Sequence, residues 1–256
     1  RVDLLHVEPD AESAVPVMGE GLSGAAVEQI IESIKAEGTR RLEAAKALYE
    51  EHCAKAGLPT VEPDDKPEPG KFAVAFRHVV GREAEEIKRR GRLADLIILS
   101  RPKAAGEGSA PGFDTALFDS GRPLLLVPSD GSEKIGGCIA IAWDRSREAT
   151  RAVDAALPFL VEAEKVVILS AREGKAKVEP SQLSWYLAGH GIAAKTWAFT
   201  PESGALGEEL LAEAAKAGAD LMIMGGYGHS RLRELVLGGA TREVLQKAAI
   251  PVLMAH

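Results

Sequence analysis

The sequence predicts an α/β protein made of two related half-domains, each built around a parallel sheet. Two observations support this fold class. Short apolar runs alternate with longer stretches of helical periodicity along the chain, which is the pattern of parallel strands joined by crossover helices. In addition, three apolar segments occur twice in the same order, which favours a duplicated unit over chance similarity.

The first half combines short apolar strands with one long helix. Valine and isoleucine recur at spacings of three and four within residues 22–56, and Gly57 ends this stretch, so we expect an amphipathic helix there. A polar, proline-rich loop follows at residues 63–70. A second helix is expected over residues 83–92, and strands over residues 2–7, 72–80, 96–99 and 124–127.

After a polar linker at residues 129–133, the pattern restarts in a more complete form. An apolar stripe over residues 149–160 marks the first helix of the second half. Gly218 stands at the C′ position that ends a later helix, expected over residues 206–217. The other helices are expected over residues 181–188, 206–217 and 241–248, and the strands over residues 139–143, 166–169, 192–199, 221–224 and 252–255.

The repeated segments define the two halves. They pair Val2-Asp-Leu-Leu with Val166-Val-Ile-Leu, Ala94-Asp-Leu-Ile-Ile-Leu with Ala219-Asp-Leu-Met-Ile-Met, and Pro123-Leu-Leu-Leu-Val with Pro251-Val-Leu-Met-Ala. We expect one domain over residues 1–130 and another over residues 134–256. The strand and helix at residues 139–160 have no counterpart in the first half. Either that half never had them, or the chain begins one strand and one helix late; we favour the second, because a missing inner strand would expose unpaired backbone.

Composition excludes several classes of protein. The formal net charge of −7 argues against nucleic-acid binding, which needs an excess of lysine and arginine on one surface. Cys53 and Cys138 are far apart and form no CxxC motif, and the six histidines show no metal-ligand spacing, so we expect neither a disulfide nor a metal site. No apolar run is long enough for a membrane span and no signal peptide is visible, so we expect a cytoplasmic protein.

The segment from Met224 to Thr241 carries the clearest sign of ligand chemistry. Gly225 and Gly228 are separated by two residues, and nine residues then lead to Gly238, between an apolar strand and a helix. Glycine allows a backbone to approach a ligand closely, and a helix N-terminus offers unpaired amides and partial positive charge. The segment therefore predicts an anion cradle made mainly of backbone amides.

This segment resembles the ATP-binding signature of the universal stress protein family, in which Gly, two residues, Gly, nine residues and Gly precede Ser or Thr. Other similar segments are Leu4-Leu-His-Val, Ala142-Trp-Asp-Arg-Ser and Gly238-Gly-Ala-Thr-Arg-Glu-Val-Leu, which match the family's second strand, the end of its first strand and the start of its last helix. The resemblance implies two tandem half-domains with five-stranded parallel sheets in the order 3-2-1-4-5, the first half-domain lacking its first strand and helix.

The resemblance also assigns roles to residues of the second half. Asp144 would contact the nucleoside end of the ligand, backbone near Ala171 would line the base pocket, and the three signature glycines would surround the ribose and phosphates. Trp143 and Tyr227 would flank the ligand, with packing as the alternative role. The complete expected nucleotide-binding set is Ala142, Trp143, Asp144, Ala171, Met224, Gly225, Tyr227, Gly228, Gly238, Gly239, Ala240 and Thr241.

Two positions depart from the family pattern. Gly239 stands where ATP-binding members usually carry Ser or Thr, so one hydroxyl donor is lost, at a cost of about 0.5–1.5 kcal/mol. Thr241 could supply another hydroxyl. Arg145 replaces a common glycine, and it could shield the pocket, pair with phosphate or simply face solvent.

The first half lacks the signature. After its matching strand it has no glycine pair at the required spacing, and Pro102 and Pro111 interrupt the segment. We expect no nucleotide there. The first half would instead pair with the second half, as the dimers of single-domain relatives do, and the chain could also form a homodimer.

These observations favour a stress-response protein that holds ATP, ADP or AMP, possibly with Mg²⁺, as a regulatory ligand without catalytic residues. The alternatives are a nucleotide-free scaffold acting through dimerisation and protein partners, and a slow ATPase or ATP-dependent enzyme. Ser230 beside His229 lacks the Gly-x-Ser-x-Gly context of a hydrolase. There is also no Walker lysine motif.

Overall fold

The computed structural model describes residues 1–11, 24–101, 111–128, 134–171, 181–202, 204–227 and 239–256. The chain divides into two compact units, Arg1–Glu86 and Ile87–His256. Helix α3 (Glu83–Gly91) crosses this division. No helix in these ranges is long and apolar enough to cross a membrane.

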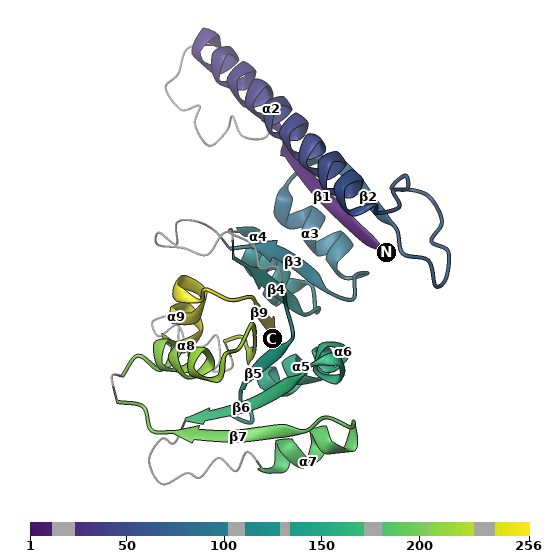
Figure 1. Cartoon of the computed structure of the whole chain (residues 1–256). Helices are drawn as coiled ribbons and strands as arrows, with labels where there is room; N and C mark the ends of the chain where they lie inside the picture. The colour runs from purple at the N-terminus through teal and green to yellow at the C-terminus, as the bar shows by residue number, and fades with distance from the viewer. Residues whose placement is uncertain (12–23, 102–110, 129–133, 172–180, 203, 228–238) are drawn as a thin grey trace. The chain divides into compact units, whose positions relative to one another are not determined.

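The first unit is a parallel strand pair with a long helix beside it (Figure 1). Strand β1 (Val2–Pro9) pairs with β2 (Val74–Gly81), and α2 (Gly24–Ala56) contacts both strands. The Tyr49 hydroxyl of α2 donates a hydrogen bond of 3.1 Å to the Val74 carbonyl of β2, and the Tyr49 ring lies 5.4 Å from the Phe76 ring. The predicted long helix and its end before Gly57 are confirmed.

The second unit contains a seven-stranded sheet in the order β3-β4-β9-β8-β5-β6-β7. Its strands are β3 (Ile97–Ser100), β4 (Leu124–Val127), β5 (Cys138–Ala142), β6 (Lys165–Ala171), β7 (Ala194–Phe199), β8 (Leu221–Gly225) and β9 (Val252–Ala255). All neighbouring pairs are parallel except β4 and β9, which pair antiparallel.

The strand order agrees with the expected α/β fold. In the second half, β7-β6-β5-β8-β9 is the order 3-2-1-4-5 when strands are numbered along the chain. In the first half, the described strands form the pairs β1-β2 and β3-β4, which are the pairs that remain when strand 1 is removed from that order. Because β4 pairs with β9, strands of both halves share the larger sheet.

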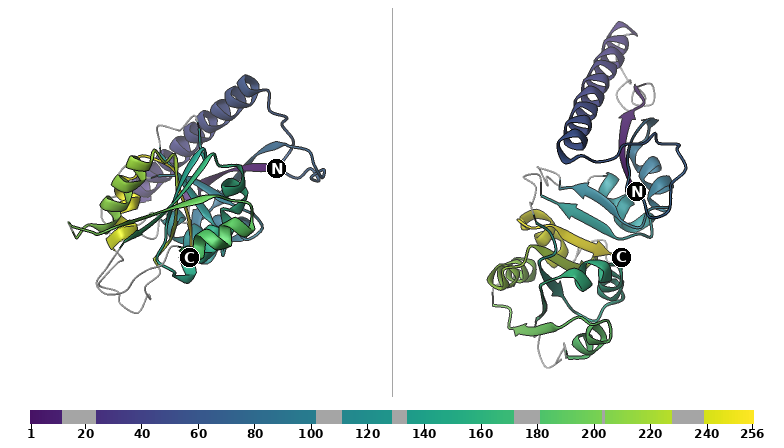
Figure 2. Two further views of the ribbon diagram at one scale, coloured as in Figure 1. Left: turned by 60° about the horizontal axis from the view of Figure 1, so that its bottom comes forward. Right: turned by 45° about the vertical axis from the view of Figure 1, so that its right-hand side comes forward.

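Helices cover both faces of this sheet (Figures 1 and 2). They are α4 (Pro111–Asp114) with its π-helical continuation η2 (Thr115–Asp119), α5 (Arg147–Ala155), α6 (Leu157–Glu162), α7 (Ser181–Gly189), α8 (Leu206–Ala217) and α9 (Gly239–Lys247). The stripe expected as one helix over residues 149–160 is divided at Ala156. Pro158 lies at the start of α6, where its missing amide is tolerated.

Alternate residues of each strand enter two separate cores. Ile139 and Ile141 of β5 pack in the core beneath α5, α6 and α7, whereas Ala140 packs in the core beneath α8 and α9. All three side chains are fully buried. This period-two alternation into two apolar layers is why strands in a covered parallel sheet read as continuous apolar runs.

A single carboxylate fixes the beginning of β5. Asp220, just before β8, accepts hydrogen bonds from the backbone amides of Gly136, Gly137 and Cys138 at 2.9, 3.0 and 3.1 Å. These bonds align the entry to β5 with the adjacent strand β8. Asp95 occupies the same place in the first half's repeated segment and is exposed.

We expect Asp220→Ala to lower the free energy of unfolding by about 2 kcal/mol, because three partly buried amides lose their acceptor. Asp95→Ala is the matched control and should change that free energy by less than about 0.5 kcal/mol. Urea denaturation of both variants measures the difference, and equal effects would contradict this role for Asp220.

Candidate functional site

The candidate site lies where the chain reverses its direction across the larger sheet. From β5 the chain passes to β6 on one side, whereas β8 lies on the other side of β5. In open α/β sheets, ligands bind in the crevice beyond the carboxyl ends of the strands at this kind of switch point. Here those ends are Ala142 of β5 and Gly225 of β8.

The turn after β5 presents Asp144 at the start of α5. Its Oδ1 accepts a 2.8 Å hydrogen bond from the Ser146 amide. The Ser146 hydroxyl in turn accepts a 3.0 Å hydrogen bond from the Ala149 amide and caps α5. Arg145 between them has a φ of 66°, a conformation that favours glycine. Glycine would therefore adopt this turn with less strain than Arg145.

Gly225 is required by close packing at the end of β8. A Cβ on Gly225 would stand 2.6 Å from the Ala149 nitrogen and 2.9 Å from the Glu148 carbonyl carbon. The first turn of α5 therefore lies directly against the end of β8. Glu148 is buried there, with 4% of its surface exposed, and its Oε1 lies 3.5 Å from Nη2 of Arg147.

The glycine segment begins with an ordered turn. The Gly226 amide donates to the Ala255 carbonyl of β9 at 2.8 Å, and the Gly226 carbonyl lies 2.9 Å from Nδ1 of His256. Tyr227 has a φ of 54°, and its amide donates to the buried Thr241 hydroxyl at 3.4 Å. Because that hydroxyl accepts this bond, its own proton remains available for another acceptor.

Helix α9 is held at its beginning by α8. Oε2 of Glu243 in α9 accepts a 2.7 Å hydrogen bond from the Gly207 amide of α8. A Cβ on Gly207 would collide with the Ala240 carbonyl, so the two helices approach closely. This contact fixes the first turn of α9, which contains Gly239, Ala240 and Thr241.

Some of the expected site residues lie outside the described ranges, and the others differ in their positions and burial. Gly228 and Gly238 lie outside the described residues, so their roles stay predictions. Met224 is buried in the core beneath α8 and α9, and Trp143 packs against the core on the other face. Ala171 is the last residue of β6.

Sequence reasoning missed several polar and aromatic groups near this edge. Ser170 is 1% exposed, and its hydroxyl has no hydrogen-bond partner among the residues that the structure describes. It occupies the repeat position of His6, whose Nε2 is also buried without such a partner. Phe118 and His256 lie against the glycine turn. Burial, and secondarily Asp114, raise the pKa of Tyr227, while Arg242 opposes the rise.

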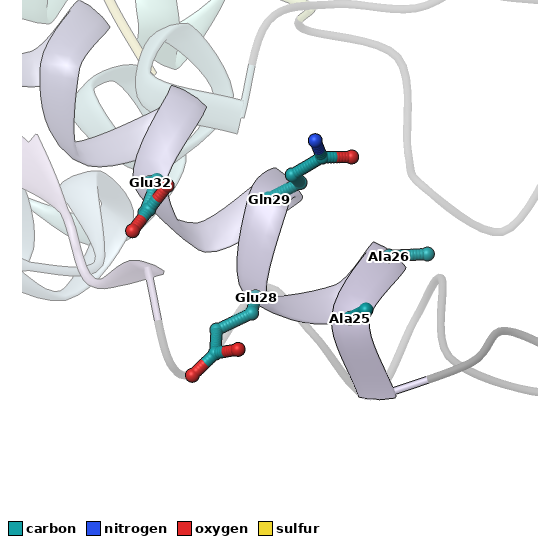
Figure 3. Close-up of a pocket in the computed structure, with 5 residues that line it drawn as sticks. All are labelled: Ala25, Ala26, Glu28, Gln29 and Glu32. Carbon is teal, nitrogen blue, oxygen red and sulfur yellow. The ribbon is translucent and has the colours of Figure 1, made fainter.

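The pocket of about 390 Å³ shown in Figure 3 is not part of this candidate site, because the residues that line it belong to α2 of the first unit. The residues that line it are Ala25, Ala26, Glu28, Gln29 and Glu32. The carboxylates of Glu28 and Glu32 project from the helix, which disfavours an anionic ligand. Within the described ranges, no three His, Cys, Asp or Glu side chains gather as a metal site would require.

Comparisons with known proteins agree on one family. Residues 138–256 match the model of the Universal stress protein family. Universal stress protein Slr1230 of Synechocystis sp. is 59% identical over 34 residues, a segment that covers 13% of this chain and only 12% of that protein.

The chain also resembles solved structures of other proteins. A universal stress protein from Archaeoglobus fulgidus DSM 4304 superposes with a TM-score of 0.64 at 16% identity, covering 99% of this chain and 84% of that chain. Universal stress protein UspA from Lactobacillus plantarum gives a TM-score of 0.34 at 17% identity, covering 47% of this chain and 97% of that chain. The first of these likenesses supports the fold.

We expect Gly225→Ala to lower the free energy of unfolding by about 1–3 kcal/mol, because the added methyl group would overlap the backbone of α5. Gly189→Ala, at a position where a Cβ meets no neighbouring atom within 4 Å, is the matched control and should not destabilise. Thermal denaturation compares the two variants, and a Gly225→Ala protein as stable as the wild type would show that α5 does not approach so closely.

Proposed function

Since this chain belongs to the universal stress protein family through residues 138–256, we propose that it binds an adenine nucleotide (ATP, ADP or AMP) in that domain as a regulatory ligand. The observation that carries this proposal is the strand–turn–helix arrangement at the switch point. There, Gly225 packs against the first turn of α5, and Tyr227 is bonded to Thr241 in the first turn of α9.

The chemistry of this edge suits a nucleotide. Helices α5 and α9 both begin beyond carboxyl ends of strands, and helix N-termini favour phosphate through unpaired amides and the helix dipole. Asp144 is exposed and already oriented by the Ser146 amide. A carboxylate held in this way can accept hydrogen bonds from ribose hydroxyls, which is the role that we propose for it.

A regulatory role fits the groups around the turn better than catalysis does. Tyr227 is partly buried, and burial raises its pKa further above neutral pH, so the phenol does not act as a base there. The Thr241 hydroxyl is engaged by a backbone amide. Any Mg²⁺ bound with the nucleotide would be held largely by the phosphates and water, as is usual for this ion.

The first half would not bind nucleotide. Phe113 stands ten residues before Pro123, and Thr241 stands ten residues before Pro251, so an apolar ring replaces the hydroxyl at the equivalent position. Phe113 is buried in the core. We propose that the first half supports the second by sharing its sheet through β4 and β9. Homodimerisation and a cytoplasmic location stay predictions.

Isothermal titration calorimetry tests the proposed function directly. We expect saturable binding of at least one of ATP, ADP and AMP to the wild type, and a loss of at least about tenfold in affinity for Gly228→Val, because a branched side chain would crowd the anion cradle. Gly24→Val is the control, since a Cβ at Gly24 meets no atom of the described residues within 4 Å. Absence of saturable heat with all three nucleotides would reject the function.

A gain of affinity provides a second test. Among the described residues, an added Cβ at Gly239 would meet Oε1 of Glu243, at 3.6 Å, and no other atom within 4 Å, so serine fits at the first residue of α9. We expect Gly239→Ser to tighten nucleotide binding by about two- to tenfold, the value of one added hydrogen bond. Gly239→Ala fills the same space without a hydroxyl and should leave affinity unchanged. Equal affinities for the Ser and Ala variants would show that no phosphate oxygen lies there.

A further inference from the structure

The first half of the chain contributes one wall of the glycine turn. Leu117, in the π-helical turn η2, is 2% exposed. A Cβ on Gly226 would lie 3.2 and 3.3 Å from its two methyl carbons. Leu117 therefore packs tightly against the backbone of Gly226, although more than one hundred residues separate them in sequence.

Phe118 extends this contact to the next residue of the turn. Its ring centroid lies 5.4 Å from that of Tyr227, at an interplanar angle of 52°, and 4.9 Å from that of His256, at 85°. Tilted and edge-to-face pairs of this kind are favourable. His256 in turn contacts the Gly226 carbonyl, so Phe118 and His256 contact each other and both contact the turn formed by Gly226 and Tyr227.

Tyr227 needs such support because its backbone is strained. A tyrosine with a φ of 54° is in the left-handed region, which is unfavourable for residues with a Cβ unless the surroundings compensate. Here the Phe118 ring holds the side chain, and the Thr241 hydroxyl accepts a hydrogen bond from the amide. Tyr227 lies between Gly225 and Gly228 of the signature, so its strained backbone is part of the signature itself.

The π-helical turn makes this presentation possible. Residues Thr115–Asp119 form η2 after α4, and π-helical turns often occur at functional positions. The buried Ser120 hydroxyl donates to the Ala116 carbonyl and accepts from the Arg122 amide. These bonds close the end of η2 and fix the place from which Leu117 and Phe118 project.

We infer that Phe118 is a positioning residue for the nucleotide site: the first half, which lacks a signature of its own, holds Tyr227 of the second half in the conformation that the ligand requires. This inference rests on the proposed function. An ordinary core residue at this position would affect stability alone, whereas a positioning residue affects the affinity of the folded protein.

The experiment compares Phe118→Ala with two controls. Phe118→Tyr keeps the ring. Phe159→Ala removes a ring of similar, partial burial from the core on the opposite face of the sheet. At a temperature where all variants are folded, we expect Phe118→Ala to weaken adenine-nucleotide binding by about tenfold or more, and each control by less than about twofold. Hydrogen exchange of the Tyr227 amide should become faster only in Phe118→Ala. In the tyrosinate absorbance titration, the pKa of Tyr227, which burial raises, should fall in Phe118→Ala and not in Phe159→Ala.

The outcomes separate this inference from the proposed function. Unchanged affinity in Phe118→Ala, with the wild type binding normally, overturns the positioning role and leaves the function standing. Equal weakening by Phe118→Ala and Phe159→Ala also overturns it, because stability alone would then account for both. If the wild type binds no adenine nucleotide, the function and the ligand role of Phe118 both fail. In that case, hydrogen exchange of the Tyr227 amide in Phe118→Ala tests only whether the Phe118 ring stabilises the turn at Gly226 and Tyr227.

Discussion

The candidate site depends on the close approach between Gly225 and the first turn of α5. The Ala149 nitrogen lies 2.6 Å from where any larger residue would place its Cβ, so β8 and α5 can meet only because position 225 has no side chain. The approach brings the turn after β5, with Asp144, next to the turn after β8, with Tyr227. Because β5 and β8 are hydrogen-bonded neighbours, this packing holds the start of α5 against the end of β8.

Strands of both halves share the larger sheet, but the two halves contribute different kinds of side chain to the contacts around it. In the second half, Asp220 accepts three amides at the entry to β5, and Thr241 accepts the amide of Tyr227. In the first half, the aspartate at the equivalent position, Asp95, is exposed, and Phe113 replaces the threonine. The contacts that the first half makes with the second are apolar or between strands: β4 pairs with β9, and Leu117 and Phe118 pack on the turn at Gly226 and Tyr227. The contribution of the first half to this edge of the sheet is therefore apolar packing, whereas the second half contributes the polar groups.

Local sequence patterns predicted the parts of this structure that local chemistry determines. The strands of the second half follow apolar runs, and the resemblance supplied their order, which β7-β6-β5-β8-β9 confirms. The antiparallel pairing of β4 with β9 could not be read from either strand, because both are uniformly apolar and their pattern does not identify a partner. The contact of Phe118 with Tyr227 had no local signal either. By contrast, Pro158 does carry a local signal, because proline is favoured in the first turn of a helix and disfavoured in its interior. It therefore indicates the break between α5 and α6.

Backbone strain points to the same edge independently of the glycine signature. Within the described ranges, the non-glycine residues with positive φ are Arg145 and Tyr227. One lies in the turn that leaves β5 and the other in the turn that leaves β8, the two strands that flank the switch point.

Each such residue costs of the order of 1–3 kcal/mol and persists only where its surroundings compensate. The Asp144–Ser146 bond compensates at the first position and the Phe118 ring at the second. These two strained turns flank the switch point at which we propose that the nucleotide binds.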